Sequence, residues 1–292
     1  MVAMRIAMIS TPFVAVPPPR YGGTERIVAE LVTGLAAAGH EVTLFATGYA
    51  RGGGEGARRA CFDRSRWPPE PYAELDHAGF AIDEILADGR GYDVVHTHVP
   101  SALPFARMLD APMVYTVHHD GGAEYQKLQS LYRRSRAHFV AISRRQRALM
   151  PELASARVVQ HGLDSAGYRL GAGDGGYCAF LGRFAREKGP HVAIDAARAA
   201  GVAIRLAGAP HCCDEDYFER EIGARLCTPG VTAVGEIGVE EKRDFLADAS
   251  ALLFPIDWEE PFGLVMIEAM LSGTPVLAFD RGSVREVVAF AD

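Results

Sequence analysis

The sequence predicts an α/β protein with two tandem domains, each built on a parallel sheet. Its 292 residues are 49% hydrophobic, which is enough for two cores, and no repeat or low-complexity tract interrupts them. Apolar runs of strand length alternate with helical periodicity through both halves, as expected for βαβ units. The alternation restarts after a glycine-rich segment at residues 171–176, so we assign the domains to residues 1–170 and 171–292, facing a cleft.

The first half opens with a strand, a glycine loop and a helix. Residues 4–10 form an apolar run typical of a buried parallel strand, and a proline-rich loop then leads to Gly22 and Gly23. We expect Thr24 to be the N-cap of a helix that ends before Gly39. The predicted core stripe of this helix consists of Ile27, Val28, Leu31, Val32 and Leu35. Such an arrangement accommodates phosphate, although two glycines are not the full dinucleotide fingerprint.

Five further strands complete the first half. They are predicted at residues 41–47, 94–98, 113–119, 138–143 and 158–164. Residues 49–71 are rich in Gly, Arg and Pro, and we interpret them as a surface excursion without an assigned function.

Four histidines fall where strands end, at the sheet edge where parallel sheets bind ligands. Among them we favour His118 as a functional residue because it follows an uninterrupted apolar run. We interpret His96, His98 and His119 as hydrogen-bonded structural residues. Neither an i, i+4 helical pair nor a carboxylate at fixed spacing accompanies the group, so the sequence does not favour a metal site.

The second half repeats the alternation. Strands are predicted at residues 177–182, 202–208, 231–235, 251–256 and 275–279, and helices at residues 190–200, 214–226 and 239–247. The acids of residues 214–216 resemble a metal-binding D-x-D motif, but acids in the first turn of a helix are ordinary dipole partners. We therefore predict no metal ligand there.

A further helix opens at Phe262-Gly263-Leu264, between Glu260 and Glu268. Its unpaired backbone N–H groups attract an anion. The predicted core stripe consists of Leu264, Ile267, Met270 and Leu271. Glu268 is the only charged residue in the helix and needs a partner.

Arg183 and Lys188 follow the strand at residues 177–182 and reach the same sheet edge. Residues 171–292 carry 11 Lys and Arg against 20 Asp and Glu, so an anionic ligand in this half needs specific cations. The Arg supplies a planar fork and the Lys a point charge. Three features that favour an anion therefore meet at one edge.

Composition excludes some classes of function. The net charge of −7 argues against nucleic-acid binding, which needs a basic surface. Five cysteines, an odd number without metal-type spacing, indicate reduced thiols. The sequence shows neither a secretory leader nor an apolar run of membrane-spanning length, so we expect a cytoplasmic protein. Arginines between residues 133 and 147 leave peripheral membrane contact open, although solvated helix ends explain them better.

Six motifs together resemble the family 4 retaining glycosyltransferases (glycosyl transferases group 1), over nearly the whole chain. They are Tyr21-Gly22-Gly23, Thr116-Val117-His118, Gly182-Arg183-Phe184, Glu187-Lys188-Gly189, Glu260-Pro261-Phe262-Gly263 with Glu268, and Ser272-Gly273-Thr274-Pro275-Val276. The ordered set is specific, whereas each motif alone is modest. The resemblance implies the GT-B fold, which consists of two Rossmann-like domains. In this fold the N-terminal domain lies on the acceptor side, and the C-terminal domain binds the nucleotide sugar.

The resemblance also implies a role for each site residue. Arg183 and Lys188 would neutralise the diphosphate of the sugar donor, and Glu260 would bind hydroxyl groups of the sugar. Glu268 would accept hydrogen bonds from the ribose, and His118 would bind the sugar near the reacting carbon. Backbone groups that would line the diphosphate belong to Gly22, Gly23, Phe262, Gly263 and Leu264. The implied reaction needs no divalent metal, no cofactor and no protein nucleophile, and it retains the anomeric configuration.

We therefore expect a hexosyltransferase that uses a UDP- or GDP-linked sugar and a small-molecule, lipid or glycan acceptor. Two departures from the family stand out: His161-Gly162 replaces a common Asn-Gly, and the chain stops at Asp292 where relatives continue. We accordingly expect the C-terminal domain to be incomplete. The alternatives are a nucleotide-sugar epimerase or hydrolase on the same scaffold, and a binding module without catalysis.

Overall fold

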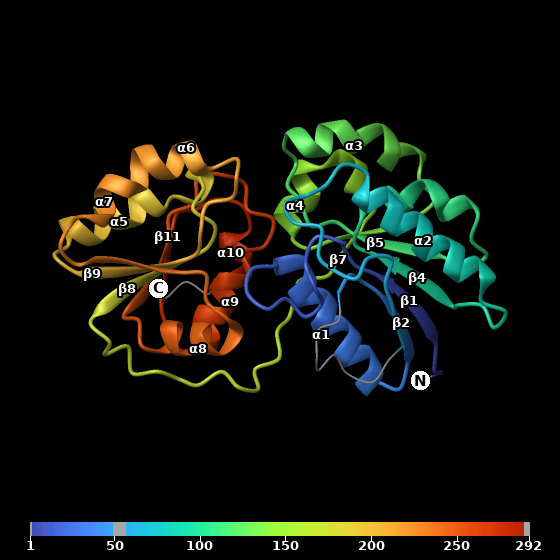
Figure 1. Ribbon diagram of the computed structural model, residues 1–292, viewed down its shortest axis with the longest axis horizontal. Coiled ribbons are helices and arrows are strands. Elements are labelled where there is room, and N and C mark those ends of the chain that lie inside the picture. The colour runs from blue at the N-terminus through green and yellow to red at the C-terminus, as the bar shows by residue number, and fades with distance from the viewer. Residues whose placement is uncertain (1, 49–56, 289–292) are drawn as a thin grey trace. The chain divides into compact units, whose positions relative to one another are not determined.

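The computed structural model describes residues 2–48 and 57–288, and its contacts divide the chain into two compact units (Figure 1). Unit 1 comprises Met1–Pro18 and Gly22–Gly162, and unit 2 comprises Pro19–Tyr21 and Leu163–Asp292. Each unit contains one parallel sheet with helices packed against it, which confirms the predicted α/β class.

The sheet of unit 1 has the strand order β3-β2-β1-β4-β5-β6-β7. Its strands are β1 (Arg5–Ile9), β2 (Glu41–Phe45), β3 (Ala57–Arg59), β4 (Val94–Thr97), β5 (Met113–Thr116), β6 (His138–Ala141) and β7 (Arg157–Val158). The surface excursion predicted over residues 49–71 contains a short strand that was not predicted, because β3 pairs with β2 at the sheet edge. Residues 49–56 of that segment lie outside the described residues.

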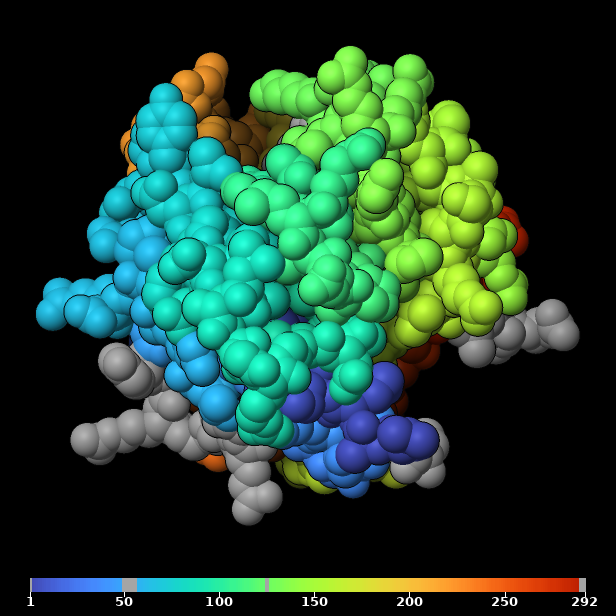
Figure 2. Space-filling model, turned by 90° about the vertical axis from the view of Figure 1, so that its right-hand side faces the viewer, coloured from blue at the N-terminus to red at the C-terminus, as the bar shows by residue number. Residues whose placement is uncertain are grey.

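Helices cover both faces of this sheet. They are α1 (Gly23–Ala37), α2 (Ala73–Ala87), η1 (Pro100–Arg107), α3 (Ala123–Arg134), α4 (Arg144–Leu149) and η2 (Pro151–Leu153). The stripe predicted for α1 is confirmed, since Val28 and Val32 pack on Ile6 and Met8. The opposite face is covered by α2 and η1 among others. Figure 2 shows the side that lies at the right in Figure 1, where the segment from α2 to η1 forms much of the surface in cyan and teal.

Thr24 is not the N-cap of α1. The carbonyl of Gly22 already accepts the first helical hydrogen bond, from Arg26 N at 3.0 Å, so Gly22 is the N-cap. Thr24 lies inside the first turn. The helix therefore begins directly at the glycine pair, without a side-chain cap.

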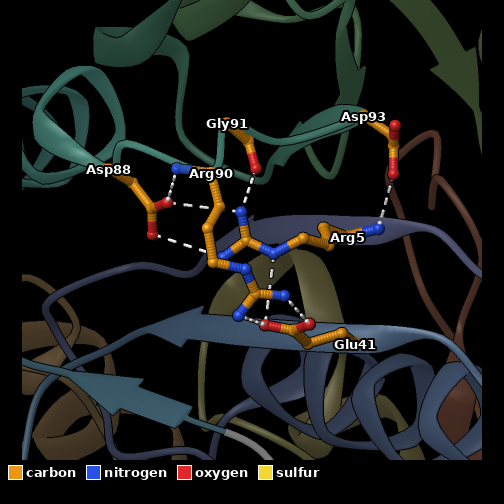
Figure 3. Close-up of polar contacts among 6 residues, drawn as sticks. All are labelled: Arg5, Glu41, Asp88, Arg90, Gly91 and Asp93. Atoms are coloured by element: carbon orange, nitrogen blue, oxygen red, sulfur yellow. Dashed lines mark hydrogen bonds and ion pairs between the residues drawn. The ribbon is translucent and has the colours of Figure 1, made fainter.

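An ion-pair network closes the amino-terminal edge of this sheet (Figure 3). The guanidinium of Arg5, on β1, contacts Asp88 at 3.3 Å and Glu41 at 3.2 Å. Arg90 also binds Glu41, at 2.6 Å, and Arg5 N donates to Asp93 at 2.7 Å. These contacts join β1, β2 and the turn before β4 at the edge opposite to the strand ends that carry the predicted site residues.

The sheet of unit 2 has the strand order β10-β9-β8-β11-β12. Its strands are β8 (Tyr177–Leu181), β9 (Ala203–Ala207), β10 (Val231–Gly235), β11 (Ala251–Phe254) and β12 (Val276–Ala278). The helices are η3 (Arg186–Lys188), α5 (Pro190–Ala199), α8 (Val239–Ala247), α9 (Leu264–Leu271), α10 (Val284–Val287) and the continuous segment α6 (Glu215–Tyr217), η4 (Phe218–Gly223) and α7 (Ala224–Leu226). All five predicted strands of this half are therefore present.

The stripe predicted for α9 is wrong. Its buried residues are Met266, Glu268 and Ala269, whereas Leu264 and Ile267 are only partly buried. Periodicity failed here because seven of the eight residues are apolar, so hydrophobicity does not distinguish one face from another. Within the described part of the chain, no helix is long and apolar enough to cross a membrane.

Candidate functional site

Each sheet has one topological switch point, where neighbouring strands connect in opposite directions. In unit 2 this point lies between β8 and β11, and in unit 1 it lies between β1 and β4. Ligands of open parallel sheets bind outside the carboxyl ends of strands at such points. In unit 2 the loop after β8 carries Arg183 and the loop after β11 carries Glu260.

Arg183 is held between two carboxylates of unit 2. One guanidinium nitrogen lies 3.1 Å from Asp214 Oδ2, and the other is paired with Glu187. The side chain therefore lies close to the strand edge with both terminal nitrogens engaged. Nη1 also donates to Cys213 Sγ at 3.9 Å, whereas Nη2 carries a second N–H group that has no hydrogen-bond partner among the described residues.

Lys188 reaches Glu260 because the two loops approach closely. Gly189 has φ 71°, and a Cβ at this position would lie 2.3 Å from Pro255 O in the segment after β11. Glycine alone accepts both the conformation and the contact. In addition, Asp257 N donates to Glu187 O at 2.9 Å, so the loops after β8 and β11 are joined through their backbones.

Glu260 is buried, with 8% of its surface exposed, and its carboxylate is bound through one oxygen. Lys188 Nζ lies 2.6 Å from Oε2, and Trp258 Nε1 donates to the same oxygen at 3.0 Å. Lys188 also lies over the Trp258 ring, 4.3 Å from its centroid. Ser283 N donates to Glu260 O at 3.0 Å and fixes the backbone. Among the described residues, none hydrogen-bonds to Oε1.

Glu268, in α9, is also bound through one carboxylate oxygen by a lysine and a second donor. It is 5% exposed, its Oε1 is ion-paired with Lys242 of α8, and Tyr168 Oη donates to the same oxygen at 3.4 Å. Residues 2–48 and 57–288 supply no hydrogen bond to Oε2. The partner that this acid was expected to need is therefore Lys242, which sequence reasoning did not identify.

The start of α9 lies between the two glutamates. Gly263 is the N-cap and Leu264 is the first helical residue. Phe262 is buried and its carbonyl accepts a hydrogen bond from Ser283 Oγ at 2.8 Å. The first N–H groups of α9 consequently have a defined position beside Glu260.

In unit 1, Gly22 and Gly23 lie where the loop after β1 enters α1. Gly22 has φ 146°, and a Cβ there would lie 2.8 Å from the Pro18 Cβ and 3.0 Å from Glu25 Oε2. Glu25 is buried in the first turn and binds Thr11. Burial raises the pKa of Glu25 above its ordinary value.

His118 follows β5, as predicted, and it is part of a histidine cluster. Its Nε2 lies 2.8 Å from Nδ1 of His98, and its ring stacks on His161 at 5.3 Å. His98 is buried, its Nε2 faces Met8 Sδ at 3.2 Å, and its ring stacks on His96 at 4.5 Å. Burial lowers the pKa of His96 and His161 to about 4, and it holds the pKa of His98 and His118 well below 6.5.

The predicted residues thus form one group in each unit. In unit 2, a continuous set of contacts and loops connects Arg183, Lys188, Glu260, Glu268 and the start of α9. In unit 1, His118 and the glycine pair lie at the carboxyl edge of one sheet.

Sequence reasoning missed Trp258 and Lys242, whereas His98 is the buried, hydrogen-bonded residue that was predicted. Its contact with His118 was not predicted, because His98 directly follows β4 and His118 follows β5, and no fixed sequence spacing links the two strand ends. No group of three or more His, Cys, Asp or Glu suited to a metal ion is present among the described residues.

Comparisons with known proteins match each unit to a family of glycosyltransferases. A model of Glycosyltransferase Family 4 matches residues 21–166, and a model of Glycosyl transferases group 1 matches residues 171–291. A glycogen synthase of Mycobacterium tuberculosis is 27% identical over 98% of this chain and 80% of its own length. A phosphatidyl-myo-inositol mannosyltransferase of Mycolicibacterium smegmatis is 27% identical over 99% of this chain and 79% of its own.

Among solved structures, a glycosyltransferase involved in avilamycin A biosynthesis is 25% identical, with a TM-score of 0.71 over 98% of this chain and 81% of that one. Anabaena HepE in complex with UDP and glucose is 19% identical, with a TM-score of 0.74 over 98% of this chain and 83% of that one.

Proposed function

The chain belongs to glycosyltransferase family 4 and has the GT-B fold, and from this premise we propose that it transfers a hexose from a UDP- or GDP-linked sugar to an acceptor with retention of the anomeric configuration. Unit 2 is the part that binds the sugar donor, and unit 1 is the acceptor side. The reaction uses no divalent metal and no cofactor.

The observation that carries this proposal is the shared geometry of Glu260 and Glu268. Each carboxylate is held through a single oxygen by a lysine and a second hydrogen-bond donor. This leaves Oε1 of Glu260 and Oε2 of Glu268 to accept hydrogen bonds from hydroxyl groups. A nucleoside diphosphate sugar presents hydroxyl groups on both sides of its diphosphate, on the hexose and on the ribose.

The start of α9 lies between these two acceptors and suits the diphosphate that joins the hexose to the ribose. The N–H groups of Gly263 and Leu264, together with the partial positive charge of the helix end, bind phosphate oxygens. Glu260 then binds the hexose and Glu268 binds the ribose.

Charge in the site is balanced closely before the sugar donor binds. Three cations face four carboxylates, so the cluster carries a net charge of minus one: Arg183, Lys188 and Lys242 against Glu187, Asp214, Glu260 and Glu268. A diphosphate therefore binds only if the cations share their N–H groups between carboxylate and phosphate. Arg183 has five N–H groups and Lys188 has three, which permits this sharing.

Negative charge grows on the diphosphate as the glycosidic bond breaks. Cations and helix N–H groups that are already fixed in place stabilise this charge more in the transition state than in the ground state. The departing phosphate accepts the proton of the acceptor hydroxyl on the same face of the sugar, which gives retention. In unit 1, His118 hydrogen-bonds to the hexose near the reacting carbon.

A panel of UDP- and GDP-linked hexoses, incubated with sugar, lipid and glycan acceptors in EDTA, tests the proposal. Proton NMR should show an acceptor-dependent product with the anomeric configuration of the sugar donor. Glu260→Gln should lower kcat at least tenfold, by the usual contribution of one positioned group. Free sugar or an epimer formed without acceptor would refute transfer, and product of the opposite configuration would refute retention.

A further inference from the structure

We propose that His98 is a positioning residue that sets the tautomer of His118, so that His118 presents Nδ1 as a hydrogen-bond acceptor. The inference rests on the proposed function for its catalytic meaning, since the group that Nδ1 would accept from is a hydroxyl of the hexose. Its structural part concerns unit 1 alone and can be tested without any sugar.

Three side chains form a chain of contacts at the switch point of unit 1. Met8 lies on β1 and is fully buried, with its Sδ 3.2 Å from Nε2 of His98. Nδ1 on the other side of the His98 ring lies 2.8 Å from Nε2 of His118. The order along the chain of contacts is therefore thioether, imidazole, imidazole.

The thioether determines where the proton of His98 lies. The sulfur of methionine is a weak acceptor and has no hydrogen to donate. At 3.2 Å a protonated Nε2 donates to it, whereas an unprotonated Nε2 would place two lone pairs against each other. A neutral His98 consequently carries its proton on Nε2, and its Nδ1 is an acceptor.

The tautomer of His98 in turn determines the tautomer of His118. Because Nδ1 of His98 is an acceptor, Nε2 of His118 must carry a proton and donate it across the 2.8 Å contact. A neutral imidazole has one donor nitrogen and one acceptor nitrogen. Nδ1 of His118 is therefore the acceptor, and among the described residues it has no hydrogen-bond partner.

Both rings are neutral at neutral pH. Burial beside other imidazoles holds the pKa of His98 and His118 well below 6.5, because a cation would be desolvated and would face His96 and His161. Neither ring can then donate through both nitrogens. His118 thus binds a hydroxyl as an acceptor, and a group without a donor hydrogen at that place is disfavoured.

Nitrogen-15 NMR of the histidine side chains tests the tautomers on the protein without ligand. We expect His98 and His118 to be neutral, each with a protonated Nε2 and an unprotonated Nδ1. In His98→Leu the Nε2–H of His118 loses its buried acceptor, so a substantial Nδ1–H population should appear. A protonated Nδ1 on His118 in the unaltered protein, or no change in His98→Leu, would overturn the inference.

Turnover provides the second readout. His98→Leu should lower kcat about tenfold or more, with little change of KM for the sugar donor. His98→Asn should recover most of kcat because its Oδ1 takes the place of Nδ1. Equal losses in His98→Leu and His98→Asn would indicate a merely structural role and refute positioning.

Met8→Leu removes the thioether and should introduce the other tautomer of His98. The matched control is Met113→Leu, which makes the same change at a buried methionine of β5 that packs in a different core cluster from Met8. We expect a changed His98 spectrum in the first variant only. If the unaltered protein transfers no sugar, both the proposed function and the binding of the hexose by Nδ1 are refuted. The NMR result still tests the tautomers of His98 and His118 independently.

Discussion

The ion pair between Lys188 and Glu260 gives the sharpest prediction about unit 2. Its atoms lie 2.6 Å apart, and the two side chains are 22% and 10% exposed. Lys188→Met would leave the Glu260 carboxylate with Trp258 Nε1 as its remaining hydrogen-bond donor, and would remove the cation from the Trp258 ring. Breaking a fully buried pair from one side costs about 3 to 5 kcal/mol, so for this partly exposed pair we expect about 2 to 3 kcal/mol.

A double-mutant cycle measured by urea denaturation isolates the pair. Glu260→Gln removes the charge but keeps an acceptor, so the double variant should be more stable than the sum of the two single losses predicts, by about 1 to 2 kcal/mol. Arg186→Met is the matched control, because Arg186 lies two residues away, is 65% exposed and pairs with Glu221 at 3.1 Å. An exposed pair contributes about 0 to 1 kcal/mol. Equal losses in Lys188→Met and Arg186→Met, or additive losses in the cycle, would refute the reasoning.

Three further outcomes are expected. Burial lowers the pKa of His77 from 6.5 to about 4. As the pH falls, the unfolded state therefore takes up a proton first, and the free energy of unfolding decreases between these two pH values. In urea titrations, His77→Leu should make the decrease between pH 7 and pH 4.5 smaller by about 2.5 kcal/mol. Lys242→Met should destabilise the protein by about 2 to 3 kcal/mol in the same assay, because it leaves the buried Glu268 carboxylate without its cation; a change below about 0.5 kcal/mol would contradict this. Gly189→Ala should lower the melting temperature clearly more than Gly201→Ala, since both have φ near 70° but only the first would place a methyl group against a backbone oxygen; equal shifts would contradict it.

The fold could be predicted from the sequence because its signals are local. Buried parallel strands are nearly continuous apolar runs, and the runs at β1, β8 and β11 are of this kind. The errors occur where the local signal is weak. The strand β3 has the sequence Ala-Arg-Arg and is held by its pairing with β2, and α9 is too uniformly apolar to reveal a buried face.

The positions of the site residues could be predicted for the same reason, because strand ends determine which edge receives them. Their partners could not be predicted, because they come from distant parts of the chain. Lys242 reaches Glu268 from α8, and Met8 reaches His98 across 90 residues. Such contacts depend on the order of strands in the sheet and on how helices pack against it. The partners therefore occur at no fixed sequence separation from the site residues, and a single sequence does not reveal them.

Titration calorimetry with UDP, GDP and ADP in EDTA tests the central claim most directly, that Lys188 and its neighbours hold the diphosphate of a sugar donor. We predict that the unaltered protein binds at least one of these nucleotides and that Lys188→Met binds it at least about 30-fold more weakly. Arg186→Met should stay within about twofold of the unaltered protein, because Lys188 is a partly buried cation of the site and Arg186 is an exposed one outside it. Absence of binding to all three nucleotides, or equal weakening in the two variants, would contradict the account.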